Sequence, residues 1–231
     1  MNNFNRIIPT TVIDNFFDNP DEIRKYALSL EFNSPRGSYP GFRSEQIAFI
    51  NPKLYEQINS RILSLFFDQN RDSLDISVES QFQIIPEKFE EGWAHQDVDV
   101  SGRNIAGVIY LTPDAPLDCG TSIYRQKSEP DYNDLRLRNE YYHKASIDDI
   151  EKYRKARDRY NSNFEKTLEV KNVYNRLLMY DTLEFHKESG FFGSLKENSR
   201  LTIVFFMTIN PVGKSSFPGT RLRNIVLDNI N

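Results

Sequence analysis

A strand pattern at residues 200–209 constrains the fold of this 231-residue chain more than any other feature. Successive residues of a strand point to opposite faces, so each face can be read separately. Both faces here are largely apolar, and their members are Leu201, Ile203, Phe205, Met207 and Ile209 on one side and Arg200, Thr202, Val204, Phe206 and Thr208 on the other. Such a strand is predicted to be buried on both sides, which requires further layers of structure around it.

The remaining elements follow from capping signals and periodicity. Asn19 and Asn51 each precede a proline and are expected to begin helices, because asparagine suits the N-cap and proline the first helical position. Strands are predicted at residues 7–17, 76–85, 103–111 and 175–180. The order along the chain, with helices first and strands later, favours a β-sandwich or jelly-roll core with flanking helices. We expect one mainly β domain over residues 1–231.

Residues 126–171 differ from the rest, because charged and polar side chains dominate there. Residues 146–149 resemble a capping box, and a helical stripe follows at Ile150, Tyr153, Arg157, Tyr160 and Phe164. The segment has too few apolar residues for a core of its own, so it is predicted to be a partly helical insertion. It is expected to be either a solvated face or a lid over a site.

Composition narrows the classes of partner and compartment. The net charge of −4 and the pI of about 5.5 do not indicate a nucleic-acid or membrane-surface partner. The single cysteine, Cys119, excludes an internal disulfide and a cysteine-based zinc site, which fits a reducing compartment. No apolar run is long enough to span a membrane, so we expect a cytoplasmic protein. The oligomeric state cannot be read from the sequence.

Three histidines are available for metal chemistry, and two of them form a plausible set with a carboxylate. His95 and Asp97 stand two residues apart, so an extended segment directs both side chains to the same side. His186, expected in a loop beyond the strand at 175–180, would complete a 2-His-1-carboxylate facial triad. This triad leaves coordination positions open, as non-haem Fe(II) oxygenases require. His143 is expected to be solvated, and Asp99 is a rival carboxylate.

Arg200 is unusual because it begins a strand that is otherwise predicted to be buried. A buried arginine is costly unless it is paired, and its planar fork matches a carboxylate. Thr202 shares its face, so a dicarboxylic cosubstrate would satisfy both side chains. The alternative is a surface arginine at a strand end, paired with Glu197 or Glu188.

The order of these residues resembles that of the 2-oxoglutarate/Fe(II) oxygenase superfamily: His-x-Asp, a distal histidine, and an arginine fourteen positions later. Within it, the chain is similar to small prolyl-hydroxylase-like proteins of bacteria and phages, whose substrates are unknown. The segments that carry this likeness are VIDNFFDNP at 12–20, YPGFR at 39–43, VIYL at 108–111, CGT at 119–121, NRLLMYD at 175–181 and SRLT at 199–202. They span most of the chain apart from residues 126–171.

The resemblance implies a double-stranded β-helix, which is a distorted jelly roll. It implies that His95, Asp97 and His186 bind Fe(II), while Arg200 pairs with the distal carboxylate of 2-oxoglutarate. It also implies that Tyr110 contacts the same carboxylate and that Thr202 assists in binding it. It further implies that O2 is the second cosubstrate and that an unidentified protein side chain or small molecule is hydroxylated, with release of succinate and CO2.

Other interpretations remain open from the sequence. Tyr110 is equally well explained as a core tyrosine, and Trp93 and Phe89 as core residues rather than pocket walls. Cys119 replaces the first glycine of a Gly-Gly-Thr turn in the resembling proteins and is expected to be a turn residue without chemistry. The whole protein could instead be a non-catalytic jelly-roll module for metal or ligand binding, or a zinc hydrolase with the same ligands.

Overall fold

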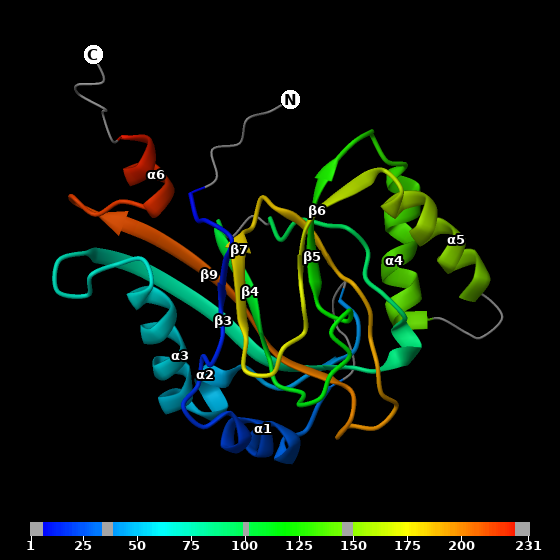
Figure 1. The fold of residues 1–231 in the computed structure, drawn as a ribbon, viewed down its shortest axis with the longest axis horizontal. Coiled ribbons are helices and arrows are strands. Elements are labelled where there is room, and N and C mark those ends of the chain that lie inside the picture. The colour runs from blue at the N-terminus through cyan, green and yellow to red at the C-terminus, as the bar shows by residue number, and fades with distance from the viewer. Residues whose placement is uncertain (1–6, 34–38, 99–101, 145–149, 225–231) are drawn as a thin grey trace.

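A computed structural model describes residues 7–33, 39–98, 102–144 and 150–224 (Figure 1). The strands are β1 (Thr11–Ile13), β2 (Phe42–Arg43), β3 (Ser73–Ile85), β4 (Ile105–Tyr110), β5 (Thr121–Gln126), β6 (Phe164–Val170), β7 (Leu177–Asp181), β8 (Phe185–Glu188) and β9 (Arg200–Val212). The helices are α1 (Pro20–Ser29), α2 (Ile47–Ile50), α3 (Pro52–Ser64), α4 (Tyr132–Lys144), α5 (Ile150–Asn161) and α6 (Pro218–Arg223), with a 3-10 turn, η1, at Glu87–Phe89. No helix among these described segments is long and apolar enough to cross a bilayer.

The strands form two sheets in which every neighbouring pair is antiparallel. The larger sheet has the order β1-β7-β4-β9-β3-β2, and the smaller has the order β6-β5-β8. In the larger sheet β3 and β9 are long neighbours, paired from Ser73 with Val212 to Ile85 with Arg200 (Figure 1). The prediction of a mainly β fold with flanking helices is confirmed.

Strand β9 lies between two layers, as its two apolar faces predict. Leu201, Ile203 and Phe205 belong to the core on the helical side of the large sheet. Val204 belongs to a second cluster, which includes Ile123 of β5 and faces the small sheet. Only the far part of this second face, from Phe206 onward, is half-exposed. The predicted burial is therefore confirmed over most of the strand.

Helices α1 and α3 cover the outer face of the large sheet (Figure 1). Helix α3 buries Leu54, Ile58 and Ile62, which recur at helical spacing, and each such side chain contributes about 1.5–3 kcal/mol when fully buried. The Asn51 side chain accepts a hydrogen bond from the Leu54 amide at 3.0 Å, as expected of an N-cap. Asn19 precedes α1 but makes no such side-chain bond, so its predicted capping role is wrong.

The insertion is partly helical, as predicted, but richer in structure than the sequence indicated. It contains α4, which was not predicted, and α5; the stripe ends in a strand, because Phe164 begins β6. The capping box at 146–149 lies outside the described residues. The insertion shares an aromatic core with the body of the protein, whose buried members include Phe89, Trp93, Tyr141, Tyr153, Tyr160 and Phe191. This shared core explains how a segment with few apolar residues is held in place.

Candidate metal centre

Three side chains from two distant parts of the chain converge at one point. The Nε2 atom of His186 lies 3.3 Å from one carboxylate oxygen of Asp97, and Nε2 of His95 lies 3.6 Å from the other. One ligand atom from each residue lies within 4.8 Å of the others. Two donors bonded at right angles to a metal at about 2.1 Å stand about 3 Å apart, so one cation can reach all three with small shifts.

Short antiparallel pairing brings the ligands together. The backbones of His95 and His186 exchange two hydrogen bonds of 2.9 Å, and the Asp97 amide donates to the Thr182 carbonyl at 3.2 Å. His186 lies in strand β8, where it pairs with Ile123 of β5. The prediction that His186 lies in a loop is therefore wrong, because β8 is a short strand whose pairing partners are distant in sequence. The ligands rest on paired backbone, which fixes their separation.

Backbone carbonyls set the tautomer of both imidazoles. The Nδ1 atom of His95 lies 2.7 Å from the Trp93 carbonyl, and Nδ1 of His186 lies 3.0 Å from the Glu184 carbonyl. A carbonyl oxygen only accepts, so each Nδ1 carries the proton and donates it. In the neutral form of each ring, Nε2 then keeps its lone pair toward the centre, which is the arrangement that metal-binding histidines use.

The electrostatics of the cluster also suit a cation. Burial and the neighbouring His186 lower the pKa of His95 to about 4, so this imidazole is neutral at neutral pH. Burial opposes the charge on Asp97, but His186 and His95 outweigh that cost and hold the pKa of the carboxyl well below its usual value. Burial lowers the pKa of His186, but Asp97 reverses the effect and raises it above its usual value. A bound cation would replace the proton that His186 shares with Asp97.

A second polar group lies deeper, between the two sheets. Arg200 is only 1% exposed, and its guanidinium forms no ion pair with any described carboxylate. Its two hydrogen bonds are long, at 3.4 Å from Nε to the Cys119 carbonyl and 3.5 Å from Nη2 to Oγ1 of Thr121. The alternative of a surface arginine paired with Glu197 or Glu188 is therefore wrong.

Tyr110 and Thr202 lie beside this arginine. The Tyr110 hydroxyl donates to Oγ1 of Thr121 at 2.9 Å, and the Arg200 guanidinium lies 5.4 Å from its ring centre. Burial raises the pKa of Tyr110, so its hydroxyl remains a donor at neutral pH. Oγ1 of Thr202 is buried without any hydrogen-bond partner. An unpaired cation and an unpaired hydroxyl on one face of β9 fit an acidic group at this position.

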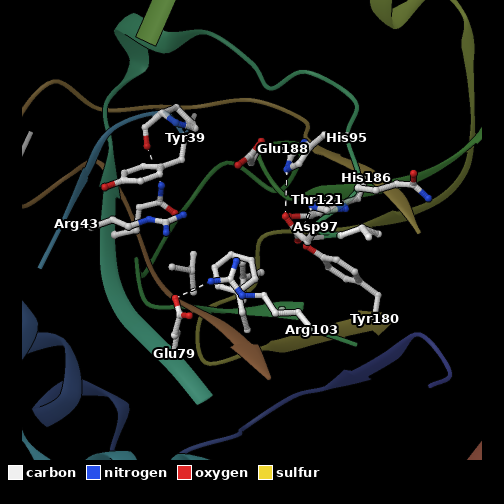
Figure 2. Close-up of a pocket in the computed structure, with 18 of the residues that line it drawn as sticks. Tyr39, Arg43, Glu79, His95, Asp97, Arg103, Thr121, Tyr180, His186 and Glu188 are labelled. Atoms are coloured by element: carbon white, nitrogen blue, oxygen red, sulfur yellow. Dashed lines mark hydrogen bonds and ion pairs between the residues drawn. The ribbon is translucent and has the colours of Figure 1, made fainter. Parts of the chain in front are cut away.

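Thr121 connects this group to the metal centre. It lines a pocket of about 340 Å³ together with His95, Asp97 and His186, and its hydroxyl contacts both Tyr110 and Arg200. Figure 2 shows Thr121 next to Asp97 and His186, with Tyr180 below them in the view. The residues present thus fit a metal ion and, behind it, a carboxylate. Thr121 belongs to the CGT motif, but sequence reasoning assigned it no role.

The pocket has further walls that sequence reasoning missed. Arg43 of β2 and Arg138 and Tyr142 of α4 line it, as does Glu188 of β8. Arg43 falls in the YPGFR motif, which was the available signal for it. Nothing in the polar sequence of α4 marks Arg138 or Tyr142, because their inward direction depends on how the insertion packs. The insertion therefore walls the site rather than forming only a solvated face.

The other candidate residues pack in the core, lie in a turn or fall outside the described part of the protein. Trp93 and Phe89 pack in the aromatic core and do not line the pocket, so the core interpretation is confirmed. Cys119 is half-buried in the turn before β5 and contributes its carbonyl to Arg200. Asp99 lies outside the described residues. His143 belongs to α4, but its side chain is likewise outside the described part of the protein.

The model of a family of unknown function, DUF6445, matches residues 4–207. No curated protein sequence matches the chain.

Similar solved structures include three proteins at low sequence identity. A prolyl hydroxylase from Trichoplax adhaerens, in complex with a hypoxia inducible factor oxygen degradation domain peptide fragment, shares 13% identity with a TM-score of 0.54, covering 89% of this chain and 84% of that one. HygX from Streptomyces hygroscopicus, with nickel and 2-oxoglutarate bound, shares 12% with a TM-score of 0.51, covering 87% and 83%. EvdO2 from Micromonospora carbonacea var. aurantiaca, complexed with 2-oxoglutarate, shares 12% with a TM-score of 0.50, covering 93% and 92%. The chain thus has the jelly-roll fold of 2-oxoglutarate/Fe(II) oxygenases.

Proposed function

Because the chain belongs to the family of unknown function DUF6445, we propose its activity from the metal centre: it is a non-haem Fe(II)- and 2-oxoglutarate-dependent oxygenase. One observation carries this proposal. Ligand atoms of His95, Asp97 and His186 lie within 4.8 Å of one another, in a pocket whose lining residue Thr121 also contacts the buried Arg200, which has no partner among the described carboxylates. The fold shared with proteins that bind 2-oxoglutarate supports it.

In this proposal His95, Asp97 and His186 hold Fe(II), and Arg200 binds the distal carboxylate of 2-oxoglutarate. Tyr110 and Thr202 donate further hydrogen bonds to that carboxylate. The metal with 2-oxoglutarate and O2 supplies the oxidising chemistry, releasing succinate and CO2 and leaving one oxygen atom for the substrate. Nickel with 2-oxoglutarate in HygX supports a divalent metal beside this cosubstrate.

The protein's own residues orient and enclose this chemistry. The carbonyls of Trp93 and Glu184 keep both imidazoles in the metal-binding tautomer. The single carboxylate of Asp97 leaves coordination positions open for the cosubstrates. Tyr180, 3% exposed, packs its ring 4.4 Å from that of His186 and shields the centre from water on one side.

We propose hydroxylation as the outcome and leave the acceptor as a protein side chain or a small molecule. The peptide bound to the similar Trichoplax prolyl hydroxylase supports a protein side chain. The geometry of the metal centre is compatible with both.

The direct test is formation of succinate from 2-oxoglutarate by the full chain with Fe(II), ascorbate and O2. We expect slow turnover without substrate, falling to the protein-free rate in His95→Ala and Asp97→Ala, because a facial triad that lacks one ligand holds the metal weakly. Asp75→Ala, which removes an exposed carboxylate of β3, is the matched control and should turn over normally. Wild-type protein that neither turns over nor binds 2-oxoglutarate would contradict the proposal and favour a non-catalytic module. Binding of zinc with indifference to 2-oxoglutarate would favour a hydrolase.

A further inference from the structure

Two half-buried arginines of the pocket lack carboxylate partners among the described residues. Arg43 of β2 and Arg138 of α4 both line the pocket that holds the metal centre. The Nε atom of each is buried without a hydrogen-bond partner, and neither guanidinium forms an ion pair with a described carboxylate. Arg103 lines the same pocket but donates to Glu79 at 2.7 Å. The pocket therefore holds one arginine with a carboxylate partner and two without.

The backbone around Arg43 fixes it firmly. Gly41 precedes it with φ of +77°, and a Cβ atom there would collide with the Ile84 carbonyl, so the turn requires glycine. The Gln83 side chain donates to the Pro40 carbonyl at 2.7 Å, and strand β2 pairs with β3. This bracing directs the Arg43 side chain into the pocket.

The guanidinium of Arg43 lies across the pocket from the metal centre. It stacks 3.7 Å over the ring centre of Tyr39 (Figure 2). In the same view, His95, Asp97 and His186 occupy the opposite side of the space. Stacking leaves the in-plane edge of a guanidinium available, and that edge is the part that binds carboxylate or phosphate in bidentate fashion.

The charge balance of the pocket favours an anion. Burial lowers the pKa of Arg43 to about 10, so it stays protonated at neutral pH. Glu188 is the carboxylate that remains in the described lining once Asp97 is assigned to the metal and Glu79 to Arg103. One carboxylate stands against the two guanidinium groups of Arg43 and Arg138. A protein keeps such an uncompensated positive charge at a cost, which a bound anion offsets.

We infer that the substrate carries an anionic oxygen group, a carboxylate or a phosphate, and that Arg43 binds it with help from Arg138. This inference rests on the proposed oxygenase function, because it assigns the substrate of that same site. It is separate from binding of 2-oxoglutarate, since Arg200 lies beyond Thr121 and does not line the pocket. The anion would fix the substrate at one end and present its remaining part to the metal.

The test uses inorganic phosphate and acetate as probes for the two sources of the anion. Each is titrated by calorimetry into the full chain loaded with Mn(II) and 2-oxoglutarate, which keeps the cosubstrate position filled. We expect wild type to bind at least one probe and Arg43→Gln to bind it about tenfold or more weakly, because a charge-assisted hydrogen bond is lost. A smaller loss is expected for Arg138→Gln. Tighter binding of phosphate or of acetate identifies which group the substrate carries.

Controls make the outcomes distinct. Arg125→Gln removes an exposed arginine that pairs with Glu165 at the surface and should bind the probe like wild type. Arg43→Lys keeps the charge without the fork, and it provides a second test if Arg43→Gln does not fold. The inference is overturned if neither probe binds wild type, or if binding is unchanged in Arg43→Gln and Arg138→Gln. A protein that binds 2-oxoglutarate but no probe contradicts this inference alone, whereas one that binds a probe but no 2-oxoglutarate contradicts the oxygenase function.

Discussion

Arg157 of α5 and Arg200 of β9 are both buried, at 7% and 1% exposure, but their surroundings are opposite. Arg157 donates to Glu90 at 3.0 Å and also lies 3.6 Å from a carboxylate oxygen of Glu91. Among the described residues, the hydrogen-bond acceptors for Arg200 are only a carbonyl at 3.4 Å and a hydroxyl at 3.5 Å. Burial opposes the charge of Arg157, but its acidic neighbours more than compensate and raise its pKa.

The difference separates two uses of a buried guanidinium. Arg157 ties the insertion to the segment around Glu90, so its charge is satisfied within the fold and contributes to structure. No described carboxylate pairs with Arg200, which lies beside the unpartnered hydroxyl of Thr202. A charge that the protein buries without a partner points to a ligand, whereas a charge that it buries with one does not. Removing either arginine should therefore affect different properties.

The largest expected effect is on 2-oxoglutarate affinity. Arg200→Met should weaken binding by about thirtyfold to several thousandfold, since truncating one partner of a buried charge pair costs about 2–5 kcal/mol. Arg157→Met should bind with wild-type affinity, because its carboxylate partners lie in the insertion and around η1. Calorimetry with Mn(II)-loaded protein measures both. Equal losses in the two variants would mean that the contrast between these arginines has no bearing on the ligand.

The next effect is on stability, where Arg157→Met should change the free energy of unfolding more than Arg200→Met does. Arg157→Met should lower the free energy of unfolding by about 2–3 kcal/mol, below the usual 3–5 for a fully buried pair because Glu90 and Glu91 are partly exposed. Arg200→Met should change it by less than about 1 kcal/mol, or raise it, because an uncompensated buried charge is removed. Urea unfolding of the metal-free protein measures the free energy directly. A large loss of stability in Arg200→Met would show that this side chain is structural after all.

The sequence singled out those residues of the candidate site whose positions depend on local geometry. His95 and Asp97 were found because residues two apart share one side of an extended segment. Arg200 was found because it interrupts a strand with two apolar faces. The assignment of His186 to a loop failed because β8 is four residues long and its pairing with β5 and His95 is non-local.

The pocket residues that the sequence did not reveal take their positions from packing between distant segments. Arg138 points into the pocket because α4 packs through Tyr141 and Tyr142 against Phe89, a contact that local periodicity does not encode. The same polar helix on a solvated surface would have the same sequence pattern. Thr121 was quoted in a motif, but its role became visible only when Tyr110 and Arg200 were seen to contact its hydroxyl.

A smaller effect is expected at Thr202, which shares the face of Arg200. Thr202→Val removes a hydroxyl that is buried without a partner, so the free energy of unfolding should stay unchanged or rise slightly. The same change should weaken 2-oxoglutarate binding about fivefold, since one hydrogen bond is worth about 1 kcal/mol. Thr112→Val is an instructive contrast, because its hydroxyl donates to the Ser199 carbonyl at 2.9 Å and its loss should destabilise the fold. Thr202→Val with normal cosubstrate affinity would remove this residue from the proposed site.

The smallest effect concerns the pH dependence of the Arg157 network. The hydrogen bond from Arg154, followed by that from Arg157, holds the pKa of Glu90 below its ordinary value of 4.5 despite partial burial. A lowered pKa means that the folded state favours the charged carboxylate, so this stabilisation is complete above 4.5 and is lost as the pH falls below it. The stability difference between wild type and Glu90→Gln should therefore narrow by about 0.5 kcal/mol on acidification, the size expected for a partly exposed ion pair. Urea unfolding at pH 6 and pH 3.5 measures it, with Glu56→Gln, an exposed carboxylate of α3, as the control that keeps the wild-type pH response. A constant difference between wild type and Glu90→Gln at both pH values would mean that the paired carboxylate adds nothing to the attachment of the insertion, and that the satisfied charge of Arg157 matters for packing alone.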